Sequence, residues 1–245
     1  MAVIAHEGTH PIMYGAAPLP IGASLRTGYL ARPDAAGKFP VVFVLPTLAG
    51  LTGFEKDLCR MFARSGMVAI GIDFYRQSGD PLEAYHALSD SRAMTDLDEI
   101  HEFVESDDVD WAVSGEVGIL GVDVGGRFGI AAAATRPWVK ALSIACTPLT
   151  GDEDRQFQVA EYLGNLPVPV LGLYGAEDEL IDVATIDEAQ RRNDHGLWIL
   201  YEGAGHSFLD MDADLYHADS AKEACQRLVE FFKTSLPKAQ ELDLG

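Results

Sequence analysis

The chain alternates short apolar runs with amphipathic stretches, and this alternation limits the folds that are open to it. Apolar runs of this length suit buried strands, and the stretches between them have the spacing of helices with one buried side. The pattern is typical of a mostly parallel central sheet with helices on both faces, an α/β fold. The predicted strands are Ser24–Ala31, Val41–Leu45, Val68–Ile72, Val117–Leu120, Lys140–Ala145, Val168–Tyr174 and Leu197–Tyr201, and the predicted helices are Gly53–Ser65, Ser91–Val104, Gly125–Ala134, Val183–Asn193 and Asp214–Lys233.

The organisation of the chain predicts one domain over residues 1–245, with a core at about 20–235. A chain of 245 residues can build a substantial core, and no repeat or linker divides it. No apolar run reaches the roughly 20 residues that span a bilayer. The first fifteen residues lack the basic start and apolar middle of a secretory signal, so we expect a cytoplasmic protein.

The charge and the cysteine content of the chain limit the classes of partner and cofactor that we expect it to bind. The formal net charge of -20 disfavours binding to nucleic acids or anionic membranes, because the long-range field repels both. The three cysteines are widely spaced and form no Cys-x-x-Cys pair, so they predict neither a disulfide framework nor a zinc site. We therefore expect a small-molecule substrate, with no cofactor and no metal.

The most informative segment is Val117–Gly129, an apolar strand that runs through Gly121-x-Asp123-x-Gly125 into an alanine-rich helix. This is the pattern of a nucleophile elbow, where two glycines allow a sharp turn that lifts the central side chain above the sheet. An ordinary strand-to-helix turn, with Asp123 as the helix N-cap, is the alternative.

Two further motifs follow in an informative order. A predicted strand leads into Gly175-Ala-Glu-Asp178, and the next leads into Gly203-Ala-Gly-His206. Nucleophile, acid and histidine follow one another in this order in α/β-hydrolases.

At this point the sequence resembles the dienelactone hydrolase family. The resemblance covers roughly residues 20 to 235 and rests on the elbow and on Asp73-Phe-Tyr-Arg76, Leu173-Tyr-Gly-Ala-Glu-Asp178 and Tyr201-Glu-Gly-Ala-Gly-His-Ser-Phe208. It implies an α/β-hydrolase fold, and at 245 residues we expect no large lid domain. By this similarity Asp178 orients the imidazole of His206, and the N–H of Val124, with one from the loop around Thr47, forms the oxyanion hole.

The chain departs from that family at the nucleophile. Asp123 stands where the family has a cysteine, and Leu45-Pro46-Thr47 stands where its oxyanion loop has a glutamate. A carboxylate that attacks an ester carbonyl forms an anhydride that readily reverts. Attack on a saturated carbon instead gives a stable alkyl ester, which water activated by His206 can hydrolyse. Haloacid dehalogenation is the most concrete version of this chemistry.

Two arginines are candidates for binding a substrate carboxylate. Arg76 matches a carboxylate-binding arginine of dienelactone hydrolases, whereas the second such arginine, expected near Asp210, is absent. Arg127 follows Asp123 by about one helical turn, as an arginine does in haloacetate dehalogenases. For both, a solvated side chain or a salt bridge with a neighbouring acid is the alternative.

Two motifs resemble metal sites but fit them poorly. His6-Glu-Gly-Thr-His10 matches the zinc-protease pattern, yet Gly8 and Pro11 oppose the helix that this chemistry needs. Asp210-x-Asp212-x-Asp214 begins like a calcium loop but lacks its glycine and terminal glutamate. We expect these three acids to cap and complement the N-terminus of the last helix.

Two other functions stay open beside displacement at carbon. Esterase or lactonase chemistry could persist, with Asp123 as a base or as a natural or engineered replacement of a cysteine. A catalytically inactive hydrolase fold that binds a ligand is the third hypothesis, since a fold alone does not establish function.

Overall fold

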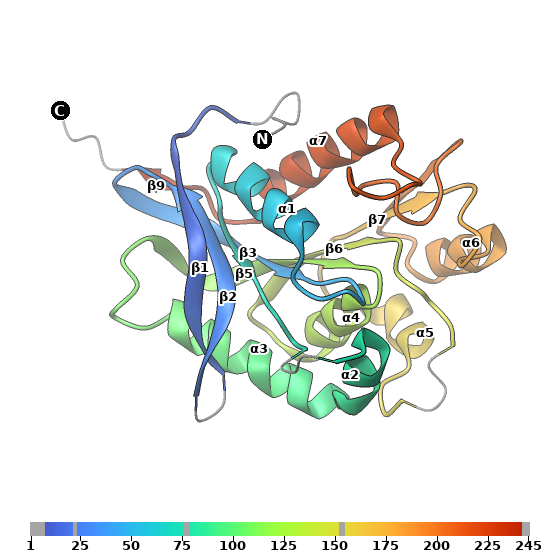
Figure 1. Ribbon diagram of the computed structural model, residues 1–245, viewed down its shortest axis with the longest axis horizontal. Coiled ribbons are helices and arrows are strands. Elements are labelled where there is room, and N and C mark those ends of the chain that lie inside the picture. Colours follow the sequence, from blue (N-terminus) through green and yellow to red (C-terminus); the bar gives the residue numbers. More distant parts are fainter. Residues whose placement is uncertain (1–7, 22–23, 76–78, 152–154, 242–245) are drawn as a thin grey trace.

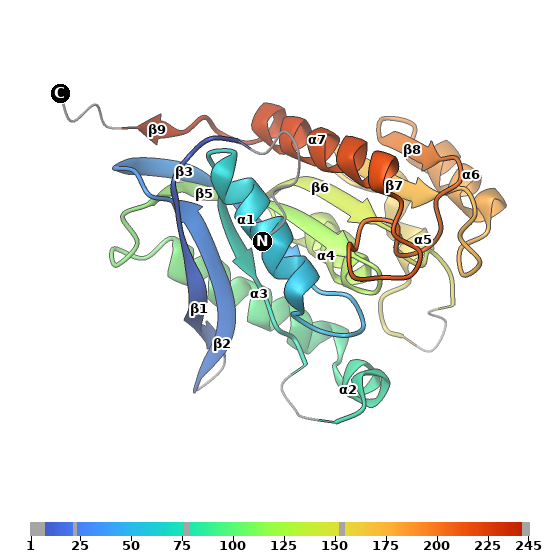
Figure 2. The same ribbon diagram turned by 45° about the horizontal axis from the view of Figure 1, so that its top comes forward.

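The computed structural model describes residues 8–21, 24–75, 79–151 and 155–241 (Figures 1 and 2). Strands and helices alternate along most of this length, as the sequence predicts. The strands are β1 (Ile12–Ile21), β2 (Ser24–Pro33), β3 (Gly37–Leu45), β4 (Val68–Gly71), β5 (Ala112–Val122), β6 (Val139–Ala145), β7 (Val170–Gly175), β8 (Leu197–Tyr201) and β9 (Gln240–Glu241). The helices are α1 (Gly53–Arg64), α2 (Pro81–Ala87), α3 (Asp90–Val104), α4 (Gly125–Thr135), α5 (Val159–Tyr162), the 3-10 helix η1 (Leu163–Asn165), α6 (Val183–Arg192) and α7 (Ala218–Ser235).

The strands of the described residues form one sheet in the order β1-β2-β4-β3-β5-β6-β7-β8, with β9 beside β3. The hairpin of β1 and β2 joins β4 in antiparallel fashion. From β4 through β8 every neighbouring pair is parallel. The predicted α/β fold is therefore confirmed, and the carboxyl ends of the parallel strands share one edge of the sheet.

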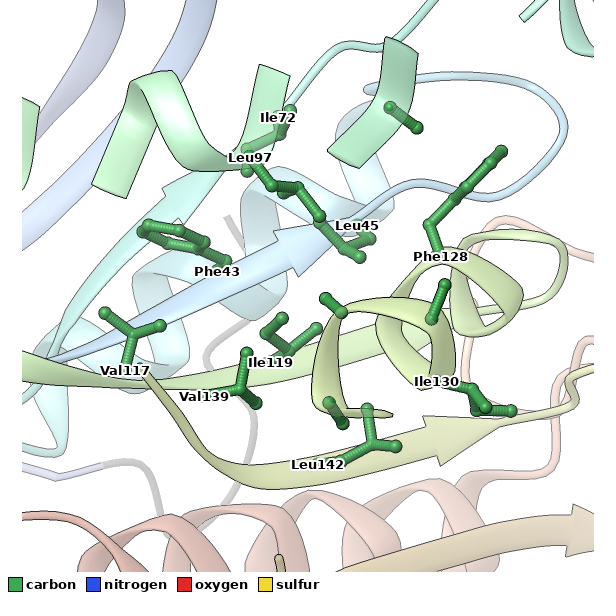
Figure 3. Packing of buried hydrophobic residues seen from close by; sticks show 14 of the residues in the cluster. Phe43, Leu45, Ile72, Leu97, Val117, Ile119, Phe128, Ile130, Val139 and Leu142 are labelled. Atoms are coloured by element: carbon green, nitrogen blue, oxygen red, sulfur yellow. The ribbon is translucent and has the colours of Figure 1, made fainter. Parts of the chain in front are cut away.

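Both faces of the sheet are buried, and strand β3 shows how. Val42 and Val44 point to one face, whereas Phe43 and Leu45 point to the other. Helices α1 and α7 supply the first face with apolar side chains, and α3 and α4 supply the second. On the second face Phe43 and Leu45 pack with Ile119 of β5, Leu142 of β6 and Phe128 of α4 (Figure 3). This double coverage explains why the parallel strands are near-continuous apolar runs.

Five short or edge elements were not predicted: β1, α2, α5, η1 and β9. β1 contains Pro18 and Pro20, which cannot donate to a ladder, but it is an edge strand and pairs only with β2. The short helix α2 begins with Pro81, and the Asp80 side chain caps it by accepting the Leu82 N–H.

The start of the last helix was predicted wrongly. α7 begins at Ala218 rather than at Asp214, and its N-cap is His217. Asp210, Asp212 and Asp214 lie in the turns before it and do not cap it. These turns have their own hydrogen bonds, among them one from the Ala213 N–H to the Asp210 carbonyl.

The carboxyl edge of the sheet carries only short extra elements in the described residues. α2 has 7 residues and α5 has 4, so the described part of the chain holds no large lid. None of its helices combines the length and the apolar character needed to cross a membrane.

The docking of α7 on the sheet can be tested at Phe232. This side chain is fully buried, packs edge-on against Phe62 of α1, and fills the space that Gly118 of β5 leaves. We expect Phe232→Ala to lower the free energy of unfolding by about 3–5 kcal/mol in urea denaturation, because it leaves a cavity. The neighbouring Phe231 is partly exposed, so Phe231→Ala should cost much less. Equal losses for the two variants would contradict this packing.

Candidate active site

Asp123 occupies a sharp turn between β5 and α4. Its φ angle is +50°, in the left-handed region that residues other than glycine rarely adopt. The Asp123 N–H donates to the Ala145 carbonyl at 2.9 Å, and its carbonyl accepts from the Gly126 N–H at 3.1 Å. These bonds hold the backbone of the turn, and the side chain lines a cavity at the carboxyl edge of the sheet.

The flanking glycines are required by close backbone contacts. A Cβ at Gly121 would lie 2.4 Å from the Cα of Gly126, and one at Gly125 would lie 2.4 Å from the Pro46 carbonyl oxygen. The turn is therefore an elbow, as the spacing of the glycines predicts. The N-cap alternative is wrong, because Val124 is the N-cap of α4 and no side chain caps that helix.

The histidine and the second acid meet Asp123 from two neighbouring loops. His206 follows β8, and its Nδ1 lies 2.8 Å from Oδ2 of Asp178, which follows β7. The His206 Nε2 lies 3.5 Å from Oδ1 of Asp123. The Asp178 side chain has no exposed surface, and its Oδ1 accepts the Leu180 N–H at 2.8 Å. The structure thus brings together the three residues that sequence order placed in one site.

The two carboxylates control the protonation of His206. Burial favours the neutral imidazole, but the contacts with Asp123 and Asp178 outweigh it and raise the pKa of His206 above its ordinary value. The imidazolium is therefore favoured while both carboxylates are charged.

The loop after β3 is organised by Glu55, which the sequence analysis did not single out. This fully buried carboxylate accepts the Thr47 N–H at 3.1 Å, the Thr47 hydroxyl at 3.0 Å and the Thr52 N–H at 2.7 Å. The loop is thereby turned so that the Leu48 N–H donates to Oδ2 of Asp123 at 3.0 Å.

This arrangement corrects the donor predicted at Thr47. Because Glu55 takes the Thr47 N–H, the loop donor that reaches Asp123 belongs to Leu48. Val124 directly follows Asp123 at the start of α4, and its role as the second donor stays a prediction. The capping-box pattern Thr52-x-x-Glu55 was the sequence signal that could have pointed to Glu55.

Asp123 and His206 open onto a cavity of about 380 Å³. It is lined by Thr47, Leu48, Ala49, Phe54, Pro81, Val122, Asp123, Cys146, His206, Ser207, Leu209 and Asp210. Cys146 lies at the end of β6 with a φ of +49°, and burial raises the pKa of its thiol well above the ordinary value. Cys146 was not predicted, since its position depends on loop conformation. Asp210 lies where the family resemblance implies a substrate-binding arginine.

The structure does not place Arg127 in the cavity. Its side chain is 3% exposed and pairs with Asp90 of α3 at 2.9 Å, and it also donates to the Phe157 carbonyl. The helical turn after Asp123 directs the guanidinium toward α3, so this placement does not fit a substrate-binding role. Arg76 lies outside the described residues.

No metal centre is found within the described part of the chain. No three His, Cys, Asp or Glu side chains there are grouped closely enough to hold an ion. His6 lies outside the described residues, and the ring of His10 packs edge-on against Phe39.

Comparison with known proteins decides the family. Residues 27–236 match the profile of the dienelactone hydrolase family. The chain belongs to the dienelactone hydrolase family. Among proteins similar to this family member, one of Escherichia coli (strain K12) named "Putative carboxymethylenebutenolidase" is 31% identical, over 91% of this chain and 87% of that protein. A Bradyrhizobium protein named "Probable 2-oxo-3-(5-oxofuran-2-ylidene)propanoate lactonase" is 27% identical, over 86% and 90% of the two chains.

Solved structures agree with this assignment. A dienelactone hydrolase structure from Klebsiella pneumoniae, named as putative, superimposes with a TM-score of 0.82 at 28% identity, over 91% of this chain and 98% of that one. The family and α/β-hydrolase fold identified from the motifs are thus confirmed. This dienelactone hydrolase family member is a hydrolase.

The contact between Asp123 and His206 can be tested without a substrate. We expect Asp123→Asn to lower the pKa of His206, because it removes one of the two charges that favour the imidazolium. Titration of the His206 ring signals by NMR measures this pKa. Asp212→Asn, which changes the same charge at an exposed site, should leave it nearly unchanged. An unshifted pKa in Asp123→Asn would mean that the two side chains do not interact.

Proposed function

We propose that this hydrolase acts by nucleophilic displacement at a saturated carbon, through an alkyl ester on Asp123. One observation carries the proposal: Oδ2 of Asp123 accepts the Leu48 N–H at 3.0 Å. That N–H comes from the loop where a donor to the substrate oxyanion is expected. Here it donates to the Asp123 carboxylate instead. A donor bound in this way favours negative charge on the Asp123 carboxyl group rather than on a substrate carbonyl.

In the first step Oδ1 of Asp123 forms a bond to the substrate carbon. The bond to the leaving group breaks, and that group departs with the electron pair, as halide in the case of a haloalkane or haloacid. Oδ2 keeps its hydrogen bond to Leu48. The product is an ester that is stable without a base.

In the second step a neutral His206 takes a proton from water, and the water oxygen attacks the Asp123 carbonyl carbon. Negative charge then develops on Oδ2, where the Leu48 N–H stabilises it, and Asp178 stabilises the imidazolium. The bond from the carbonyl carbon to Oδ1 breaks, and the departing alkoxide takes the proton from His206. Because alkylation removes the charge of Asp123, it lowers the pKa of His206, which releases its proton to solvent and is then the neutral base. After hydrolysis Asp123 is left as a carboxylic acid, and its proton passes to His206, which restores the starting state.

Haloacid dehalogenation is one concrete form of this chemistry. Its substrate carboxylate needs a cationic partner, and with Arg127 paired to Asp90 that role falls to Arg76 among the predicted residues.

Lactone or ester hydrolysis is the second candidate, favoured by the names of the similar proteins. His206 would then activate water directly against a substrate carbonyl, with Asp123 holding the imidazole. The two candidates differ in whether Asp123 becomes covalently modified.

The covalent step predicts a trapped intermediate in His206→Gln. This variant should react once with an alkyl halide and then fail to turn over, because only the second step needs the imidazole. Chloroacetate and its neutral counterpart chloroacetamide serve as substrates. Intact-mass spectrometry should show one added acid or amide group per chain, and peptide mapping should locate it between Val117 and Arg127.

The control is Asp123→Asn in the same background, which should abolish the adduct because an amide is a poor nucleophile. An adduct on Cys146 would assign the nucleophile to that thiol instead. If wild type consumes lactones or esters while the variant forms no adduct, the second candidate holds. No reaction with any of these compounds would favour a binding function.

A further inference from the structure

The cavity has a second carboxylate that the proposed reaction does not use. Asp210 follows Leu209 in the wall of the cavity that holds Asp123 and His206. Its Oδ1 accepts the Asp212 N–H at 3.0 Å, which fixes the side chain in a short turn. In the described part of the chain no cation forms an ion pair with Asp210, so its charge is available to a bound molecule.

The remaining wall offers little to balance this charge. Leu48, Phe54, Pro81, Val122 and Leu209 provide apolar surface, and no lysine or arginine of the described residues lines the cavity. The charge of a protonated His206 is shared between Asp123 and Asp178.

The surroundings of Asp210 add to the negative potential. A small neighbouring hollow shares Phe54, Leu209 and Asp210 with the cavity and is also lined by Asp57 and Asp212. Asp57 is paired with Arg60, but Asp212 is exposed. A carboxylate entering past Asp210 is repelled, whereas an ammonium is attracted, and apolar walls strengthen both effects by excluding water.

We propose that Asp210 determines the substrate specificity of the cavity by favouring molecules whose remote end is cationic over neutral ones, and neutral ones over carboxylates. The inference rests on the proposed function in one respect, because it assumes that the substrate binds in this cavity. It ranks the substrates of the displacement, with electrophiles that carry an ammonium away from the reacting carbon first, neutral electrophiles next and haloacids last.

The test uses binding, so that it stands apart from the chemistry of Asp123. Three unreactive probes of similar size are compared by titration calorimetry on wild type: 2-phenylethylammonium, 2-phenylethanol and phenylacetate. We expect the ammonium to bind most tightly and phenylacetate most weakly, with a spread on the order of tenfold or more between them. Asp210→Asn keeps the acceptor for the Asp212 N–H and should remove most of the spread, and Asp210→Arg should invert the order.

Asp212→Asn is the matched control. It removes the same charge at a position two residues from Asp210, and the Asp212 side chain does not line the cavity. It should preserve the wild-type order. Circular dichroism melts of all variants check that each remains folded. Equal affinities for the three probes, or an order that survives Asp210→Asn, would overturn the inference even if an Asp123 adduct is found. A loss of the order in Asp210→Asn would uphold it even if no adduct forms.

Discussion

The close approach of α4 to the ends of β3 and β5 is the constraint on which the site depends. At Gly121 and Gly125 the backbones are too close for a side chain, and Asp123 between them is held in the left-handed region. That conformation costs roughly 1–2 kcal/mol for a residue other than glycine. The bond from the Asp123 N–H to the Ala145 carbonyl and the burial of α4 offset this cost. As a result, the Asp123 carboxylate is fixed at the carboxyl edge of the sheet, where the loops after β3, β7 and β8 begin.

Two buried acids then set the chemistry around that carboxylate. Glu55 shapes the loop so that Leu48, rather than Thr47, donates to Asp123, and Asp178 holds His206 on the other side. Asp123 is thus stabilised by a hydrogen-bond donor at one oxygen and by an imidazole at the other. This environment supports the proposed role of Asp123 as a carboxylate that attacks and is later regenerated.

Sequence reasoning succeeded where the signal is local or follows chain order. The parallel strands are apolar runs because both faces of the sheet are covered. The two elbow glycines were recognisable from their spacing because the backbones there are too close for a side chain. The order of Asp123, Asp178 and His206 along the chain was enough to predict that they lie in one site. Several failures depend on contacts made by the folded chain. The direction of Arg127 is set by Asp90, which lies 37 residues earlier, and the donor at Leu48 is set by the buried Glu55. Strand β1 tolerates its prolines because it lies at the edge of the sheet.

The origin of the oxygen in the product tests the covalent account most directly. In a single turnover of wild type in water enriched with oxygen-18, with enzyme in excess over an alkyl halide, the alcohol released should carry ordinary oxygen from Oδ1 of Asp123. The heavy isotope should appear in the Asp123 carboxyl group and reach the product only in later turnovers. Heavy oxygen in the alcohol of the first turnover would mean that water attacks the substrate directly, and the account of Asp123 as the nucleophile would be wrong.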